Sequence, residues 1–286
     1  MTVVGAPGHI AEPASLARRT LANLAAWCTA LVQPPRLPLG GAPPSVWPPL
    51  SRLAIGTGAT IAVVAAAMLR LDWWALGHYL GVPVWLGRLF GAITEFGKSE
   101  WFLVPSAVLL IALAAASSPA LGRVTCLVLA SLAARTGFVF VAVAAPSLTV
   151  TVLKRLIGRA RPLRIEGHDV YFSPLAWRVD FASFPSGHST TAFAAAVALG
   201  ALFPRARTAL WVYAGLIALS RVILSAHYPS DVIAGAVAGG CGALLVRRWF
   251  AARRLAFTLR PDGSVHALPG PSLQRIKKVA GRIAGQ

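Results

Sequence analysis

Apolar residues dominate the chain in six long runs, separated by polar, charged or proline-containing segments. Crossing an apolar layer of ~30 Å takes about 20 helical residues, so runs near that length predict membrane-spanning helices. We therefore predict an all-α fold, a polytopic membrane helix bundle with six transmembrane helices and additional interfacial helices. The predicted spans cover residues 53–69, 101–116, 134–154, 189–203, 210–224 and 232–246.

Charged residues set the expected limits of these spans, because an ionisable side chain is costly in hydrocarbon. The first span is expected to end at Arg70 and Asp72. Residues 73–98 mix aromatic and charged side chains, a composition typical of the membrane interface, and predict a helix lying on the membrane surface. Arg135 leaves the start of the third span open, with residues 124–133 extending its helix beyond the apolar layer.

Two tails flank the predicted core of residues 53–250. Residues 1–52 are rich in Pro, Gly and Ala, and apolar side chains recur at helical spacing over 14–32, which predicts a short amphipathic helix on the membrane. A signal sequence is the alternative, but the apolar part begins late and Pro34-Pro35 follows in place of a clear cleavage site. Residues 251–286 form a basic C-terminal tail.

The charge is strongly unbalanced, with 27 Lys and Arg against 9 Asp and Glu. No nucleic-acid-binding motif accompanies the basic residues, so attraction to anionic lipid explains them better than nucleic acid does. Residues 1–52 and 247–286, with the segments around 123–135 and 205–207, hold 17 of the 27. The positive-inside rule then predicts that both termini of this multi-pass protein lie in the cytoplasm and that the opposite face lies outside it. We expect the membrane to be the bacterial inner membrane, so that this face lies in the periplasm.

A set of polar residues falls at that opposite face, at the ends of the third to sixth spans. Singly, each has an ordinary explanation: Lys154 and Arg161 suit interfacial anchors, and Asp231 suits a helix cap. Their convergence on one face favours a functional site, because ionisable groups beside the apolar layer usually mark function. The set comprises Lys154, Arg161, Ser186, Gly187, His188, Arg221, His227 and Asp231.

The residue types in this set suit phosphate chemistry. Arg161 and Arg221 can each hold an oxyanion through two hydrogen bonds, and Lys154 adds a third cation. Pro185-Ser186-Gly187-His188 opens the fourth span, where Ser186 can cap the helix and free backbone N–H groups favour a bound phosphate. We therefore expect a phosphate-binding site at this face.

His227 and Asp231 suggest how a phosphate group would react there. Pro229 is well placed to begin the sixth helix, which puts His227 just before the helix and Asp231 in its first turn. The carboxylate can then hold one imidazole nitrogen and leave the other available as a nucleophile or base. His188 can act as the general acid on the leaving group.

Three segments in order resemble the signature of the type-2 phosphatidic acid phosphatase superfamily, which vanadium haloperoxidases share. They are Lys154-(six residues)-Arg161-Pro162, Pro185-Ser186-Gly187-His188, and Ser220-Arg221-(five residues)-His227-(three residues)-Asp231. The resemblance covers the core and implies a metal-independent lipid phosphatase without a cofactor. It implies that His227 forms a phosphohistidine assisted by Asp231, that His188 protonates the departing oxygen, and that the other five residues hold the phosphoryl group.

The resemblance implies a membrane lipid phosphate as substrate: phosphatidylglycerophosphate, phosphatidic acid, undecaprenyl pyrophosphate or lipid A. The residues do not choose among these, and they leave the oligomeric state open. Headgroup selectivity is expected to lie in the loops 73–100 and 164–182. A lipid phosphotransferase using the same histidine and a non-enzymatic lipid carrier are the alternatives, whereas the apolar spans argue against a soluble vanadate-dependent haloperoxidase.

Overall fold

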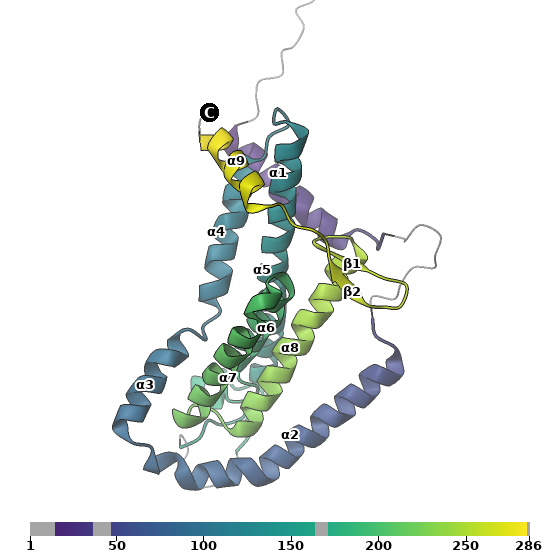
Figure 1. Cartoon of the computed structure of the whole chain (residues 1–286). Helices are drawn as coiled ribbons and strands as arrows, with labels where there is room; N and C mark the ends of the chain where they lie inside the picture. Colours follow the sequence, from purple (N-terminus) through teal and green to yellow (C-terminus); the bar gives the residue numbers. More distant parts are fainter. Residues whose placement is uncertain (1–14, 37–46, 164–170, 285–286) are drawn as a thin grey trace, which may run out of the picture.

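The computed structural model describes residues 15–36, 47–163 and 171–284. These residues are mostly helical, with a small two-stranded antiparallel sheet near the C-terminus (Figure 1). The predicted all-α membrane bundle is confirmed in this respect. The helices and strands are α1 (Leu16–Val32), α2 (Leu50–His78), α3 (Val84–Glu95), α4 (Glu100–Ala116), α5 (Arg123–Ile157), α6 (Gly187–Leu202), α7 (Arg207–Ile223), α8 (Pro229–Ala252), β1 (Phe257–Leu259), β2 (Val265–Ala267) and α9 (Leu273–Ala284).

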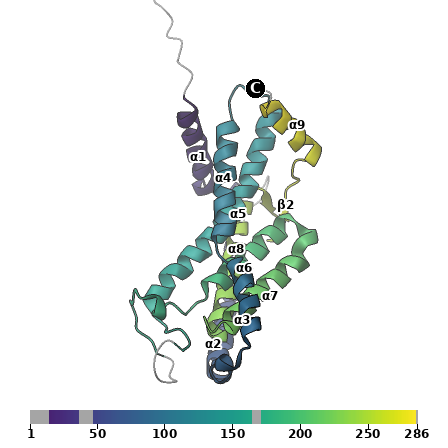
Figure 2. The same ribbon diagram turned by 90° about the vertical axis from the view of Figure 1, so that its left-hand side faces the viewer.

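Helix α6 lies at the centre of the bundle and packs against α5, α7 and α8. The outer helices attach to this group: α2 packs on α8, α3 on α7, and α4 on α5. Figure 2 shows α1 beside α4, at the end of the molecule away from α2 and α3. The inner helix therefore carries mostly small side chains, and five of its alanines have at most 2% of their surface exposed: Ala192, Ala194, Ala195, Ala196 and Ala198.

Helices α6 and α8 approach closely because α8 carries glycine at the contact. A Cβ atom added at Gly235 would lie within van der Waals overlap of the Ser186 carbonyl oxygen, at 2.3 Å, and one added at Gly239 would lie 2.1 Å from the Thr190 carbonyl oxygen. Small residues at such spacing allow helix backbones to pack directly in membrane proteins. The contact fixes the start of α6 against the start of α8.

Five helical stretches in the described part of the chain are long and apolar enough to cross a membrane. The prediction of six spans is therefore approximate, because α6 has only 16 residues. The third span belongs to one continuous helix, α5, which includes residues 124–133 as expected. The five stretches are Leu50–His78, Val84–Ala116, Arg123–Ile157, Pro204–Ile223 and Pro229–Ala252.

Helix α2, which contains the first predicted span, does not end at Arg70 and Asp72, as the sequence predicted, but continues to His78. Asp72 is tolerated because it is fully buried and ion-paired with Arg159 at 2.7 Å, whereas Arg70 is exposed. The prediction of one helix over 73–98 is also wrong. That segment contains the end of α2, a short 3-10 turn over Tyr79–Gly81 and helix α3.

The C-terminal segment after α8 folds back onto the bundle. The β1–β2 hairpin packs against the end of α8, and α9 packs on α5. Arg135, which raised the question of where the third span begins, donates to the Leu268 carbonyl at 2.7 Å and to Ser131 within its own helix. The Arg135 guanidinium is thus hydrogen-bonded to uncharged acceptors, one of them in the C-terminal segment.

Candidate active site

His227 and Asp231 lie at the junction of α7 and α8, in the predicted arrangement. Tyr228 is the N-cap of α8 and Asp231 is its third residue, where the carboxylate accepts the Tyr228 backbone N–H at 2.9 Å. His227 precedes the cap, and its Nδ1 lies 3.7 Å from Asp231 Oδ2. This separation is longer than a hydrogen bond, although such contacts often tighten only with substrate bound. Asp231 therefore faces one ring nitrogen of His227.

Both residues are almost completely enclosed. His227 is 1% exposed and Asp231 is 0% exposed. Burial lowers the pKa of His227 to about 4, although Asp231 opposes the shift. The imidazole is therefore neutral at pH 7, the form in which a ring nitrogen has a lone pair to offer.

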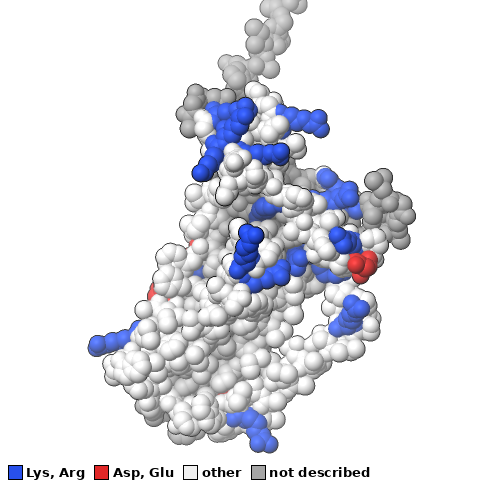
Figure 3. Space-filling model, in the orientation of Figure 1, with Lys and Arg blue, Asp and Glu red and all other residues white. Residues whose placement is uncertain are grey.

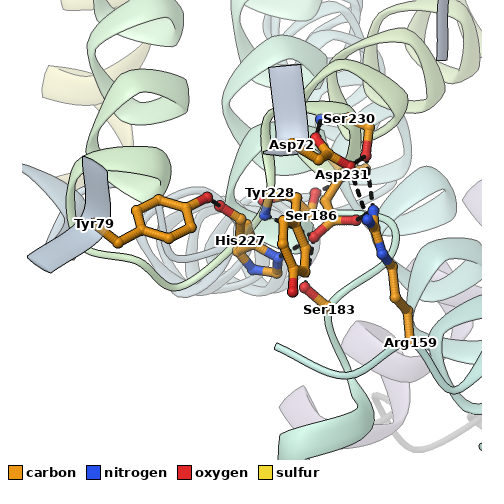
Figure 4. Close-up of polar contacts among 10 residues, drawn as sticks. Asp72, Tyr79, Arg159, Ser183, Ser186, His227, Tyr228, Ser230 and Asp231 are labelled. Atoms are coloured by element: carbon orange, nitrogen blue, oxygen red, sulfur yellow. Dashed lines mark hydrogen bonds and ion pairs between the residues drawn. The ribbon is translucent and has the colours of Figure 1, made fainter. Parts of the chain in front are cut away.

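The backbone of His227 is fixed on both sides. Its N–H donates to the Arg221 carbonyl at 3.2 Å. Its carbonyl accepts the Tyr79 hydroxyl at 3.0 Å (Figure 4). Burial raises the pKa of Tyr79 far above its usual value, so the hydroxyl stays protonated and keeps donating. The end of α2 thereby helps to hold the candidate nucleophile in place.

A buried arginine that sequence reasoning missed holds Asp231 from the other side. Arg159 Nη1 donates to Asp231 Oδ1 at 2.5 Å, and Arg159 Nη2 donates to Asp72 Oδ2 at 2.7 Å (Figure 4). Ser183 donates its hydroxyl to Asp231 Oδ2 at 2.5 Å. Burial lowers the pKa of Arg159, but the two carboxylates outweigh that effect, so the pKa is raised and the guanidinium remains charged. Both oxygens of the Asp231 carboxylate thus accept hydrogen bonds, which fix its orientation beside His227.

The segment before α6 is held by backbone contacts and not by side-chain capping. Ser186 is the N-cap of α6, as predicted, yet its hydroxyl makes no cap hydrogen bond and no hydrogen bond to any described residue. The Ser186 N–H donates to the Asp231 carbonyl at 2.9 Å, which ties this segment to α8. A Cβ atom at Gly187 would lie 3.3 Å from Lys154 Nζ, so glycine lets the lysine come close to the backbone.

The predicted cations gather at the same place. Lys154, in the last turn of α5, interacts electrostatically with Arg161, Arg221 and Asp231. Arg221, in the last turn of α7, is buried and donates from Nη1 to the Thr94 hydroxyl of α3 at 2.7 Å. Its Nε makes no hydrogen bond within the described residues. Three positive charges thus surround the start of α6.

His188 completes the set from the first turn of α6. It is half-buried, and it interacts electrostatically with Arg221, His227 and Lys154. Gly97, at the turn between α3 and α4, packs against its ring, since a Cβ atom there would lie 2.9 Å from His188 Cδ2. The structure therefore brings together all eight predicted residues: Lys154, Arg161, Ser186, Gly187, His188, Arg221, His227 and Asp231.

Sequence reasoning missed five residues that position this set: Asp72, Tyr79, Thr94, Arg159 and Ser183. Asp72 gave a usable signal, because it is an acid beside an apolar run and such acids usually have a functional partner. Arg159 lies two residues before Arg161 and gave no signal of its own. Glu166, His168 and Asp169 belong to the predicted selectivity loop 164–182 and lie outside the described residues.

Within residues 15–36, 47–163 and 171–284, no group of three or more His, Cys, Asp or Glu side chains is placed to hold a metal ion. Metal independence remains a prediction that rests on the family resemblance. The groups that the site does present are two histidines, a carboxylate and a ring of cations. They suit a nucleophilic attack on a bound phosphate.

Comparison with known proteins agrees with this chemistry. A sequence model of the PAP2 superfamily matches residues 135–255. A lipid A 1-phosphatase of Rhizobium etli is 37% identical over 208 residues, which cover 71% of this chain and 88% of the relative. A lipid A 1-phosphatase of Rhizobium johnstonii is 38% identical over 182 residues, covering 62% of this chain and 72% of the relative.

Among solved structures, one match is the crystal structure of a transmembrane PAP2 type phosphatidylglycerolphosphate phosphatase from Bacillus subtilis. The sequences are 20% identical, the TM-score is 0.42, and the match covers 80% of this chain and 94% of that chain. The matched family model includes every predicted site residue, and the first relative extends the match over most of its own length. The chain is therefore a membrane lipid phosphatase that belongs to the PAP2 superfamily.

Proposed function

We propose that this enzyme hydrolyses the 1-phosphate of lipid A, or of a closely related acylated glycolipid phosphate. The observation that carries this proposal is the identity to two lipid A 1-phosphatases, which spans most of the length of each. It favours lipid A over phosphatidylglycerophosphate, phosphatidic acid and undecaprenyl pyrophosphate, which the sequence motifs alone leave equal.

The proposed reaction begins with attack by His227. Its Nδ1 faces Asp231 and carries the proton, so Nε2 has the lone pair that bonds to phosphorus. The ester P–O bond breaks, its electron pair leaves with the lipid oxygen, and that oxygen takes a proton from His188. The product on the enzyme is a phosphohistidine whose ring carries a positive charge beside the Asp231 carboxylate.

The phosphoryl group itself is proposed to rest between the cations and the start of α6. Lys154, Arg161 and Arg221 offset the charge on its oxygens, and the Ser186 hydroxyl, which has no partner among the described residues, is available to donate to one of them. In the second step His188 draws a proton from water, and the water attacks phosphorus to release inorganic phosphate.

We propose that this site opens to the periplasm and that both termini are cytoplasmic. Lys and Arg side chains gather over the end of the molecule that carries α1, α9 and the hairpin (Figure 3). The site lies toward the other end, where α2, α5, α6 and α8 meet. The positive-inside rule supports the orientation in which the basic end faces the cytoplasm.

Headgroup selectivity is proposed to lie in the loops 73–100 and 164–182, of which residues 164–170 lie outside the described part. The first of these segments is largely helical in the structure, and its residues Thr94 and Gly97 contact Arg221 and His188. Exchange of this segment with that of a relative should change the preferred lipid. An unchanged preference would remove the segment from substrate selection.

The test is phosphate release by the detergent-purified protein in the presence of EDTA. The panel contains lipid A, phosphatidylglycerophosphate, phosphatidic acid and undecaprenyl pyrophosphate, and His227→Ala is compared with wild type. We expect fastest release from lipid A and at least a ~10³-fold loss in the variant, because the nucleophile is absent. Mass spectrometry of the lipid products separates hydrolysis from transfer, since a newly phosphorylated acceptor lipid would identify a phosphotransferase.

A further inference from the structure

Asp72 and Arg159 form a buried chain of charges that ends on Asp231. Asp72 and Asp231 are both 0% exposed and Arg159 is 1% exposed, and the guanidinium lies between the two carboxylates. Burying three charges in this way costs desolvation energy that mutual attraction only partly offsets. Apolar side chains of similar size in place of such ion-paired residues often stabilise a fold to the same degree or more. The three buried charges therefore call for a functional reason.

Arg159 alone would work against the proposed chemistry. It contacts Asp231 Oδ1 directly, so as a lone partner it would cancel most of the negative charge that Asp231 presents to His227. The ring of His227 becomes positively charged as its Nε2–P bond forms, and that charge needs a nearby anion. A neutral Arg159–Asp231 pair would supply little stabilisation.

Asp72 removes this conflict. It binds the second nitrogen of the same guanidinium at 2.7 Å, which leaves the group of three with one net negative charge. Asp72 also accepts the Ser230 N–H at 3.0 Å and the Ser230 hydroxyl at 2.6 Å, so it is held to the first turn of α8 beside Asp231. Helix α2 therefore contributes a negative charge to a site whose eight predicted residues lie between the end of α5 and the start of α8.

We propose that Asp72 is a charge-balancing residue, which neutralises Arg159 so that Arg159 can orient Asp231 without cancelling its charge. Asp72 acts through Arg159 and does not touch the substrate, so it is a positioning residue. The inference rests on the proposed histidine mechanism, but not on the identity of the lipid.

The test compares four forms of the full-length protein: wild type, Asp72→Asn, Arg159→Gln and the double variant Asp72→Asn/Arg159→Gln. Asp72→Asn keeps the shape of the side chain and should lower kcat about 10- to 100-fold, with KM unchanged or lower because the site becomes more positive. The double variant regains one net negative charge. Its kcat should exceed that of Asp72→Asn by about tenfold, a coupling that a purely structural role would not produce.

Two further variants control for local damage. Ser230→Ala removes hydrogen bonds to Asp72 and Arg159 without changing any charge, and should lower kcat less than about threefold. Asp72→Glu keeps the charge and should lie closer to wild type than Asp72→Asn does. Thermal unfolding in detergent confirms that each variant is folded. If the double variant does not fold, the kcat values of the single variants Asp72→Glu and Ser230→Ala are each compared with that of Asp72→Asn and still decide the question.

Phosphate release is measured with lipid A and with p-nitrophenyl phosphate, a soluble phosphomonoester that requires no lipid recognition. Wild-type activity on p-nitrophenyl phosphate but on no lipid would reject the proposed substrate and still test Asp72. The inference is overturned if Asp72→Asn retains wild-type kcat, if Ser230→Ala is as slow as Asp72→Asn, or if the folded double variant is no faster than Asp72→Asn. No release from either substrate by wild type would overturn both proposals.

Discussion

The buried arginines of the active site differ in their partners from the arginines that hold the C-terminal segment at the other end of the bundle. In the site, Arg159 and Arg221 donate to carboxylate or hydroxyl side chains. At the basic end, Arg135 and Arg247 donate to the backbone carbonyls of Leu268 and Val265, and Arg135 also donates to the Ser131 hydroxyl. These partners at the basic end are uncharged, whereas Arg159 is paired with two carboxylates of opposite charge. Charge should therefore be indispensable to activity at the site end and mainly structural at the other.

The sharpest test of this contrast removes charge at the site end without changing shape. Asp231→Asn should lower kcat about 10²- to 10⁴-fold and change KM much less, because the carboxylate stabilises the imidazole ring only as it becomes charged. Steady-state phosphate release gives both parameters. An unchanged kcat would remove Asp231 from the mechanism and with it the difference between the two ends.

Helix packing at the site end provides the second test. Gly239→Ala places a Cβ atom in contact with the Thr190 carbonyl, which is backbone and cannot move aside, so the α6–α8 contact must open. We expect a loss of about 2–3 kcal/mol in stability, together with reduced activity. Gly240→Ala is the matched control, because nothing lies within 4 Å of the new atom. Equal unfolding temperatures for the two variants would contradict the close contact.

The basic end should respond in stability alone. Arg135→Gln shortens the donor to the Leu268 carbonyl and should cost about 1–3 kcal/mol, seen as a lower midpoint of thermal unfolding in detergent. The kcat of the folded fraction should stay within about twofold of wild type. A large fall in kcat with an unchanged midpoint would mean that the two ends are coupled.

The smallest expected effect is a shift in pH dependence. His227 has a pKa of about 4, so it stays neutral when the pH falls below 6.5, where an ordinary histidine becomes protonated. The fall of kcat/KM at acidic pH should therefore occur well below pH 6.5. Asp231 raises this pKa, so Asp231→Asn should move the limb to lower pH, on the order of one unit. Comparing the variant with wild type cancels the ionisation of the substrate. A shift to higher pH would contradict the assigned role.

Local spacing in the sequence was enough to place several site residues. Pro229 begins α8, so Asp231 falls in its first turn and faces His227 four residues earlier. Ser186 is the N-cap of α6, which begins at Gly187, as the order of residues in this motif predicts. These relations follow from helix geometry within short segments. The alternation of the predicted spans across the membrane places the segments at the same face.

The remaining positions depend on partners far away in the chain. Asp72 looked like the end of a helix because its charge seemed unpaired, whereas its partner Arg159 lies 87 residues later. Thr94 binds Arg221 across 127 residues, and Tyr79 binds His227 across 148. Hydrophobic periodicity contains no information about such pairings. It therefore misjudged where α2 ends, although it identified the apolar run correctly.

The length of helix α5 relates the position of the active site to the thickness of the bilayer. Its 35 residues extend about 52 Å, much more than the ~30 Å of a bilayer's hydrocarbon. Arg135 and Lys154 lie about 28 Å apart along it, which matches that thickness. Arg135 contacts the C-terminal segment and Lys154 lies in the active site, so one continuous helix, which contains Pro146 between them, links the bilayer thickness to the position of Lys154. In a membrane thinner than this spacing the helix would have to tilt or to bend at Pro146, and either change would move the catalytic end relative to the lipid surface that supplies its substrate.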